Sequence, residues 1–293
     1  MGRLEDRVAV VTGASRGIGK SIATAFAAEG ARVAVVARTE LQWDARMPGT
    51  VHETVAQIEA AGGQAVAIPA DLANPEDVEA IIDRAKAALG PIDILINNAA
   101  LTIPGRPPKA GAAGRSTSTS TVDQPRAGSG VGRNSFLSFP LKGFRLHFEI
   151  GLFATYRLMQ LALPDMIEAG RGSIVNISSL AGFIPGEGPY ERAGAPGPIA
   201  YGGNKAAIHH LTQSVAIEMQ PLGVAVNVLS PSEPVITPGN LVAAAGETNF
   251  ASPEDFAEAT IRVALADPNT TTGQLLWSED VLHPELGRRG WLR

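Results

Sequence analysis

The chain has 293 residues, enough for one large α/β domain or two small ones with a buried core. Hydrophobic residues make up 45% of it and charged residues 18%, a globular composition that excludes an intrinsically disordered protein. The absence of cysteine excludes disulfides, thiol catalysis and cysteine metal sites, and the net charge of −5 gives no reason to expect binding to nucleic acid or a membrane.

Short apolar runs alternate with segments of helical periodicity along the chain. The first strand is expected at Val8–Val11, before a glycine-rich turn and a helix in which Ile18, Ile22 and Phe26 recur at helical spacing. The further expected strands are Arg32–Ala37, Ala65–Ile68, Ile92–Ile96, Ser173–Ile177, Val224–Leu229 and Gln274–Leu276. The further expected helices are Val51–Ala61, Pro75–Leu89 with Asn74 as N-cap, Phe144–Glu168, Ala200–Met219 and Pro253–Leu265.

This alternation predicts an α/β fold of three layers, a doubly wound parallel sheet of the Rossmann type with helices on both faces. Strands that are apolar throughout fit such a sheet, because helices cover both of its faces. We expect residues 1–293 to form a single domain, with an insertion at about 102–135 and a C-terminal tail at about 278–293.

The expected insertion, Thr102 to Ser135, is dominated by Gly, Pro, Ala, Ser, Thr and Arg, and includes the low-complexity run Ser116–Thr121. Such a composition cannot bury a core and predicts an irregular loop. Its five basic residues against the single acid Asp123 leave two interpretations open. The loop could contact an anionic substrate or RNA, or it could be a solvated insertion, which we favour.

Glycines join the first strand to the first helix in the segment Thr12–Gly19, with the spacing Gly-x-x-x-Gly-x-Gly. Such glycines allow a tight turn and a close approach of backbone to a pyrophosphate, which the free N–H groups of the helix then bind. The segment predicts a dinucleotide site. Its candidate cofactor contacts are Gly13, Ser15, Arg16, Ile18 and Gly19.

The second strand ends at Ala37-Arg38, where an acidic residue would bind the ribose 2′-hydroxyl of NAD. No acid occurs before Glu40, and Arg38 together with Arg16 could clamp a 2′-phosphate instead. The sequence therefore favours NADP(H) over NAD(H), the alternative being that both arginines are merely solvated.

Tyr201 and Lys205 lie four residues apart in an expected helix and therefore share one face of it. A cation beside a phenol lowers the tyrosine pKa toward neutrality and makes the hydroxyl a usable acid or base. Such pairs also arise by chance in many helices, so the pair gains weight only from the motifs around it.

Taken together, the motifs resemble those of the short-chain dehydrogenase/reductase family in its compact single-domain branch. The matching segments are the glycine loop, Asp71-Leu72, Asn97–Ala100, Asn176–Ser179 and Tyr201-x-x-x-Lys205. The resemblance covers nearly all of the chain outside the expected insertion.

The resemblance implies that Ser179, Tyr201 and Lys205 are catalytic. Ser179 would donate a hydrogen bond to the substrate oxygen, Tyr201 would transfer the proton, and Lys205 would bind the nicotinamide ribose. The further cofactor contacts that it implies are Asp71 and Leu72 at the adenine, Asn98 and Ala99 at the ribose, and Pro231, Val235 and Thr237 at the carboxamide and pyrophosphate. Asn97 and Asn176 are expected to hold the sheet together.

Three positions depart from the family pattern. Gly151 stands where the family usually has an asparagine that kinks the helix and seats a relay water behind the lysine, so we expect a slower proton relay. The 22-residue step from Ser179 to Tyr201 exceeds the family's usual dozen and predicts a specificity loop. Tyr190 in that loop is a rival catalytic tyrosine, but it lacks a lysine four residues later. Ser232 replaces a glycine of the family's cofactor-binding loop.

The favoured hypothesis is an NAD(P)-dependent oxidoreductase that interconverts a secondary alcohol and a ketone. The alternative is a cofactor-binding protein with impaired catalysis that acts as a sensor or scaffold; a dehydratase or epimerase is disfavoured by the intact Ser–Tyr–Lys set. We expect a cytoplasmic homotetramer or dimer assembled through the two long helices. His209 and His210 are interpreted as structural or interfacial, with no metal site.

Overall fold

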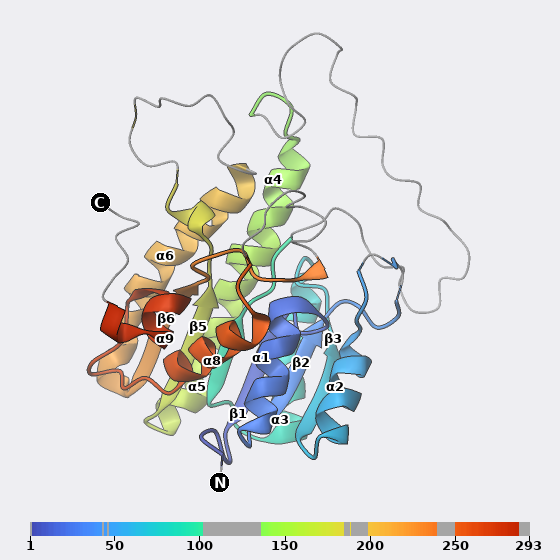
Figure 1. The fold of residues 1–293 in the computed structure, drawn as a ribbon, viewed down its shortest axis with the longest axis vertical. Helices are drawn as coiled ribbons and strands as arrows, with labels where there is room; N and C mark the ends of the chain where they lie inside the picture. Colours follow the sequence, from blue (N-terminus) through green and yellow to red (C-terminus); the bar gives the residue numbers. More distant parts are fainter. Residues whose placement is uncertain are drawn as a thin grey trace.

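The computed structural model describes residues 2–42, 44–45, 47–101, 136–184, 188, 199–238 and 250–286 (Figure 1). The strands are β1 (Val8–Thr12), β2 (Arg32–Ala37), β3 (Gln64–Pro69), β4 (Ile94–Asn97), β5 (Gly172–Ile177), β6 (Val224–Ser230) and β7 (Leu275–Trp277). The helices are α1 (Gly17–Ala28), α2 (Val51–Ala60), α3 (Pro75–Leu89), α4 (Leu141–Phe148), α5 (Ala154–Glu168), α6 (Ile199–Met219), α8 (Pro253–Ala264) and α9 (Ser278–Leu282). Shorter turns are η1 (Glu149–Phe153), η2 (Leu180–Gly182), η3 (Gln220–Leu222) and η4 (Pro284–Leu286).

The strands form one sheet in the order β3-β2-β1-β4-β5-β6-β7, and every pairing is parallel. The predicted doubly wound α/β fold is therefore confirmed. The direction of winding reverses at β1, which lies between β2 and β4. In such sheets ligands bind outside the carboxyl ends of the strands at this reversal.

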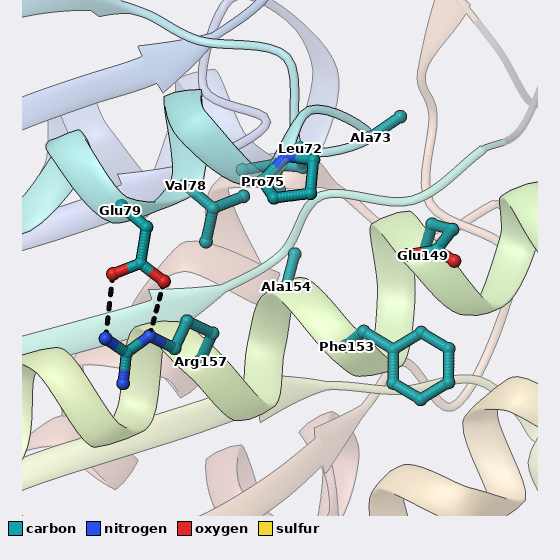
Figure 2. Close-up of a pocket in the computed structure, with 9 residues that line it drawn as sticks. All are labelled: Leu72, Ala73, Pro75, Val78, Glu79, Glu149, Phe153, Ala154 and Arg157. Atoms are coloured by element: carbon teal, nitrogen blue, oxygen red, sulfur yellow. Dashed lines mark hydrogen bonds and ion pairs between the residues drawn. The ribbon is translucent and has the colours of Figure 1, made fainter.

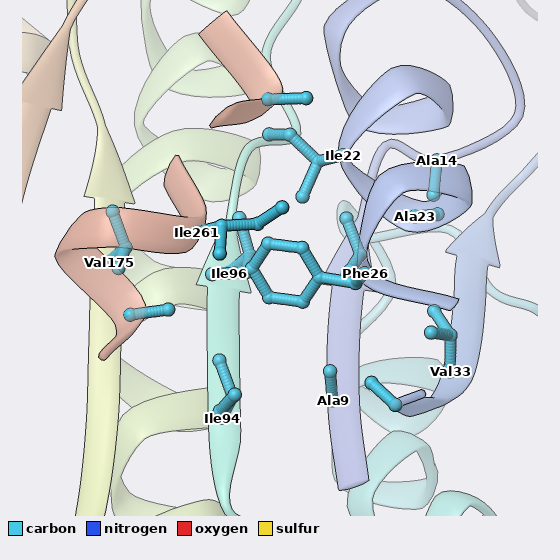
Figure 3. Close-up of a cluster of buried hydrophobic side chains, with 14 of the residues drawn as sticks. Ala9, Ala14, Ile22, Ala23, Phe26, Val33, Ile94, Ile96, Val175 and Ile261 are labelled. Carbon is cyan, nitrogen blue, oxygen red and sulfur yellow. The ribbon is translucent and has the colours of Figure 1, made fainter. Parts of the chain in front are cut away.

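Two apolar clusters cover the two faces of the sheet. Helices α1, α2 and α8 pack on one face, where Phe26 of α1 meets Ile96 of β4 and Ile261 of α8 (Figure 3). Helices α3, α5 and α6 pack on the other face through side chains such as Ile81 and Leu158. Strands β1, β4 and β6 are buried along their whole length, as expected for a parallel sheet covered on both faces.

Helix boundaries follow local capping. The side chain of Asn74 accepts a hydrogen bond from the Glu76 N–H, and Pro75 opens α3, which confirms the predicted N-cap. Thr50 and Glu53 form a reciprocal capping box at the start of α2.

The prediction of one continuous helix over Phe144–Glu168 is wrong. The helix begins earlier, at Leu141, and is divided by the π-helical turn η1 between α4 and α5. In η1 the N–H of Ala154 bonds to the carbonyl of Glu149, five residues earlier. Gly151, the position that departs from the family pattern, lies in the middle of this turn.

Three expected features fall wholly or partly outside the described residues. They are the insertion at 102–135, most of the loop at 185–198 with Tyr190, and the end of the tail at 287–293. The first part of the expected tail is described, and it forms α9, which packs beside α8.

Candidate active site

Ser179, Tyr201 and Lys205 come together at the carboxyl edge of the sheet. Ser179 follows β5 and opens the turn η2, while Tyr201 and Lys205 lie on α6, which packs against η2. Ser179 and Tyr201 are joined by a side-chain hydrogen bond. The Nζ of Lys205 lies 5.7 Å from the centre of the Tyr201 ring and donates to the Ile177 carbonyl at 2.6 Å.

Burial sets the charge state of this pair. It lowers the pKa of Lys205 to about 8 from an ordinary 10.5, because the ammonium leaves water for a site with few compensating charges. Burial also raises the pKa of Tyr201, against the opposing hydrogen bond from Ser179. The expected lowering of the Tyr201 pKa is therefore not found, because desolvation outweighs the influence of the lysine.

A second serine supports the segment that carries Ser179. The Oγ of Ser178 and the Nε2 of His209 are 2.6 Å apart, and both residues are buried. The His209 ring lies 4.4 Å from that of Phe183, which in turn lies 4.9 Å from that of Trp277. Burial and the charge of Lys205 lower the pKa of His209 to about 4, so its ring is neutral near pH 7. These contacts agree with the structural role predicted for His209; His210 beside it is exposed.

The glycine loop packs closely on the end of β4. Gly13 has φ +69°, and a Cβ there would lie 2.9 Å from the Ala99 Cα. A Cβ on Gly19 would overlap the Gly13 carbonyl and lie 2.5 Å from the Nδ2 of Asn98. Glycine is therefore required at both positions for the turn to close.

The start of α1 fits a dinucleotide phosphate. Arg16 is the N-cap residue of α1, and its side chain accepts no hydrogen bond from the first N–H groups of the helix. These donors therefore remain for a ligand. Thr237 lies beside this loop, since a Cβ on Gly17 would sit 3.2 Å from its side chain. Ser15 is buried and Ile18 packs into the core below the loop.

Two asparagine contacts join β1, β4 and β5. The Nδ2 of Asn98 donates to the Thr12 carbonyl at 2.8 Å, and the Thr12 hydroxyl accepts from the N–H groups of Asn98 and Ala99. The Nδ2 of Asn97 donates to the Oδ1 of Asn176 at 2.9 Å, between residues that are paired in register. The predicted sheet-bridging role of Asn97 and Asn176 is confirmed.

Arg16 and Arg38 lie close enough for their charges to interact. Burial and the charge of Arg38 both lower the pKa of Arg16. The guanidinium of Arg16 donates to the carbonyls of Pro48 and Gly49 at 3.2 and 2.8 Å, which hold it beside the glycine loop. A strongly acidic ligand group would relieve this repulsion between like charges.

The remaining predicted cofactor contacts lie around the same edge. Asp71 follows β3 and accepts a hydrogen bond from the Ala73 N–H. Pro231 follows β6, while the side chain of Val235 is fully buried in the core. Ser232 bonds through its Oγ to the Glu279 N–H at 3.1 Å, so the serine that replaces the family glycine caps α9.

Leu72 lines a different hollow, of about 180 Å³, between α3, η1 and α5 (Figure 2). Glu79 and Arg157 form an ion pair across one end of this hollow, with a contact of 2.6 Å, and Phe153 lines the other end. Ser179, Tyr201 and Lys205 do not line it.

His147 and Asn204 are two buried polar residues near the site that the sequence did not single out. Both are buried, and the Nδ2 of Asn204 donates to the His147 carbonyl at 2.5 Å. The His147 ring lies 6.3 Å from that of Tyr201. The only available signal was the place of Asn204 three residues after Tyr201, on the same helix face. His147 carried none, because it reaches the site through tertiary packing.

In the part of the chain that the structure describes, no group of three His, Cys, Asp or Glu residues could hold a metal ion. No helix there is long and apolar enough to cross a membrane.

The sequence profile described as "short chain dehydrogenase" matches residues 7–240. An uncharacterized oxidoreductase of Mycobacterium tuberculosis is 32% identical over 288 residues, which cover 94% of this chain and 92% of that protein. A 7alpha-hydroxysteroid dehydrogenase of Escherichia coli is 28% identical, with 94% and 93% covered. A ketoacyl reductase of a Nostoc species is 30% identical, with 93% and 79% covered.

Solved structures share the fold along most of the chain. A short chain dehydrogenase from Burkholderia cenocepacia, in complex with NADP, superposes with a TM-score of 0.69 at 25% identity and covers 94% of this chain and 97% of its own. A 7 alpha-hydroxysteroid dehydrogenase, complexed with NADH and 7-oxo glycochenodeoxycholic acid, gives 0.70 at 26% identity, with 94% and 93% covered.

Proposed function

Because the chain belongs to the short-chain dehydrogenase/reductase family, and is thus an NAD(P)-dependent oxidoreductase acting on CH–OH groups, we propose that it interconverts a secondary alcohol and a ketone with NADP(H). The observation that carries this proposal is the hydrogen bond between Ser179 and Tyr201, with the Lys205 ammonium beside the Tyr201 ring. It joins a proton donor, a second hydroxyl and a cation at the edge of the sheet where such folds bind ligands.

Each of the three side chains has one task in ketone reduction. A nicotinamide cofactor held at this edge of the sheet would supply the hydride for the carbonyl carbon. Tyr201 gives its hydroxyl proton to the carbonyl oxygen, and the Ser179 hydroxyl donates a hydrogen bond to the same oxygen as negative charge develops there. Lys205 stabilises the tyrosinate that remains. In alcohol oxidation Tyr201 takes the proton back.

Turnover of a panel of ketones and secondary alcohols with NADP(H) and NAD(H) tests this proposal. The panel includes oxo-steroids and 3-ketoacyl thioesters, because relatives are a hydroxysteroid dehydrogenase and a ketoacyl reductase. Tyr201→Phe removes the proton donor and keeps the ring, so turnover falls by at least about 100-fold while cofactor binding persists. Binding of NADPH by the unaltered protein without turnover of any compound would favour a sensor or scaffold.

The preference for NADP(H) is supported by Arg16 and Arg38, whose facing charges suit a 2′-phosphate. Replacement of Arg38 by Ala removes one of the two charges. We expect the KM for NADPH to rise about tenfold or more, with the KM for NADH changed less than twofold. An equal rise for both cofactors would contradict the assignment of a 2′-phosphate site.

An oligomer formed through α5 and α6 is supported by large apolar side chains that these helices expose. Phe153 in the adjoining turn η1 and Tyr156 on α5 are 54% and 47% exposed, and Ile217 on α6 is 77% exposed. Light scattering of the purified protein tests this assembly, and a monomer at micromolar concentration would contradict it.

A further inference from the structure

The carboxamide of Asn204 occupies the space directly above Gly151. A Cβ at position 151 would overlap the Nδ2 of Asn204 and lie 2.7 Å from its Cγ and 2.8 Å from its Oδ1. Position 151 therefore has no room for any side chain while Asn204 holds this place. The amide that the family usually carries at position 151 is absent, and an amide from α6 fills the same volume.

This amide is also bonded to the helix opposite. Its Nδ2 donates to the carbonyl of His147, the last residue but one of α4, just before the π turn η1. The bond links α6 to the point where the helical hydrogen-bond pattern changes. Asn204 thus fixes how α4 packs on α6, at the part of α6 that carries Tyr201 and Lys205.

Two polar atoms at this contact are buried and have no hydrogen-bond partner among the described residues: the Oδ1 of Asn204 and the Nδ1 of His147. Their side chains are 3% and 8% exposed, so bulk water does not reach them. An unpaired buried polar atom destabilises the folded protein, and a buried water with two or more polar partners removes that cost.

Both residues flank the reactive pair. Asn204 shares a face of α6 with Tyr201, three residues before it, and Lys205 is the next residue in the chain. His147 approaches from α4, with its ring plane at 71° to that of Tyr201. Burial lowers the pKa of His147, and the charge of Lys205 contributes to the same shift.

We propose that Asn204 and His147 are positioning residues. They hold a buried water between them, and this water binds the ammonium of Lys205, in place of the amide that the family usually carries at position 151. The carbonyl oxygen of Asn204 accepts, the His147 ring nitrogen fixes the water, and the ammonium of Lys205 donates to it. No bond to substrate is involved, so the effect on the reaction passes through Lys205. The inference rests on the proposed roles of Tyr201 and Lys205.

Replacement of Asn204 by Ser removes the carboxamide and tests this role. We expect kcat for ketone reduction to fall about tenfold, the effect of one lost hydrogen bond to a charged group, with KM for the ketone changed less than twofold. The apparent pKa in the pH–rate profile should shift too, because the ammonium of Lys205 loses the buried water that accepts its hydrogen bond. The titratable groups around Lys205 are Tyr201 and His209 on α6 and His147 on α4.

The matched control is Gln213→Ser, which removes an exposed carboxamide from the same helix and leaves kcat unchanged. Replacement of His147 by Phe keeps the ring and removes Nδ1. It lowers kcat to a similar extent, and combination with Asn204→Ser adds little, because both variants break one arrangement.

Exchange of the two positions gives the sharpest test. Gly151→Asn alone places a side chain on the Asn204 amide, so both the melting temperature and kcat fall. The double variant Gly151→Asn/Asn204→Ser returns the amide to position 151 and frees its space. We expect it to recover most of the lost melting temperature and to exceed Asn204→Ser in kcat.

The outcomes separate this inference from the proposed function. No turnover by the unaltered enzyme on any ketone would remove the proposed function itself. Turnover that Tyr201→Phe abolishes but Asn204→Ser leaves intact would overturn the inference alone. So would additive losses in the His147 and Asn204 variants, or a Gly151→Asn variant as stable as the parent protein.

Discussion

Lys205 is a buried cation, and the groups around it are mostly neutral. Burial holds the pKa of Lys205 near 8 and that of His209 near 4. Each value reflects the cost of moving a charge out of water, and each makes the folded protein respond to pH in a calculable direction.

His209 makes the protein less stable in acid. The unfolded chain takes up a proton on this ring below its ordinary pKa of 6.5, whereas the folded protein does so only near 4. The stability that the neutral ring contributes is therefore complete above pH 6.5 and is lost as the pH falls toward 4. At about 1.4 kcal/mol for each pH unit, the loss is roughly 3 kcal/mol.

Urea unfolding at several pH values measures this dependence. In His209→Gln the amide can still hydrogen-bond to Ser178 but does not titrate, so the free energy of unfolding should fall less between pH 6.5 and 4. The exposed neighbour offers a control, since His210→Gln should leave the slope unchanged. Identical slopes in the parent and His209→Gln would refute this account.

The convergence of Ser179, Tyr201 and Lys205 at one edge of the sheet was predictable from the sequence, but the residues that surround them were not. Ser179, Tyr201 and Lys205 stand in motifs whose spacing follows from strand ends and helix turns. The contact of Asn204 with Gly151 and the bond of Ser178 to His209 join residues at least 31 positions apart. Such pairs are set by the packing of α6 on η1 and β5, which leaves no periodic trace in the chain.

The turn between β1 and α1 shows how close packing overrides helix propensity. Alanine in a helix is favoured over glycine by up to about 1 kcal/mol. At Gly19, however, a Cβ would overlap the Gly13 carbonyl, and backbone atoms there have no room to move. Position 203 is the opposite case, since a Cβ there meets only the Phe148 ring at 3.8 Å.

We therefore expect opposite effects from the same substitution at two helical glycines. Gly19→Ala should destabilise the protein by about 1–3 kcal/mol and weaken NADPH binding, because the loop must shift. Gly203→Ala should stabilise it by up to about 1 kcal/mol. Chemical unfolding and fluorescence titration with NADPH measure both, and a stabilised Gly19→Ala variant would contradict the close packing seen here.

Element positions were predictable to within a few residues, except where two helical patterns meet. Valine-rich runs marked β1, β2 and β6, and Asn74 with Pro75 marked the start of α3. The turn η1 was missed, because a π turn inserts one residue without ending the helical periodicity on either side. Its presence shifts the face of α5 relative to α4.

A buried carboxylate stabilises the sheet at its amino edge, the edge opposite to Tyr201. Asp93 precedes β4 at the amino edge, where its carboxylate accepts from the Val8 N–H at 3.0 Å and from Arg7 at 3.1 Å and Arg171 at 3.2 Å. It thus ties β1, β4 and β5 together on the side away from Tyr201.

Asp93→Ala should lower the free energy of unfolding by about 2 kcal/mol, because the buried N–H of Val8 loses its acceptor. Turnover and KM should stay unchanged below the unfolding temperature. Asp93→Asn keeps an acceptor for Val8 and should cost less. Urea unfolding with parallel activity assays measures the two effects, and a lowered kcat in the folded Ala variant would show that the edges are coupled.

The position of β1 between β2 and β4 also affects how the chain is made. On one side β1 pairs with β2, where Ala9 lies opposite Val33, but on its other side Ala9 must await Ile94 of β4. A nascent chain that has completed β1–β3 therefore carries β1 as an open, valine-rich edge. At about 5–20 residues per second, that edge stays uncovered for on the order of seconds after β3 emerges. Strand edges of this kind recruit other chains, so this interval of synthesis is when the polypeptide most needs protection from aggregation.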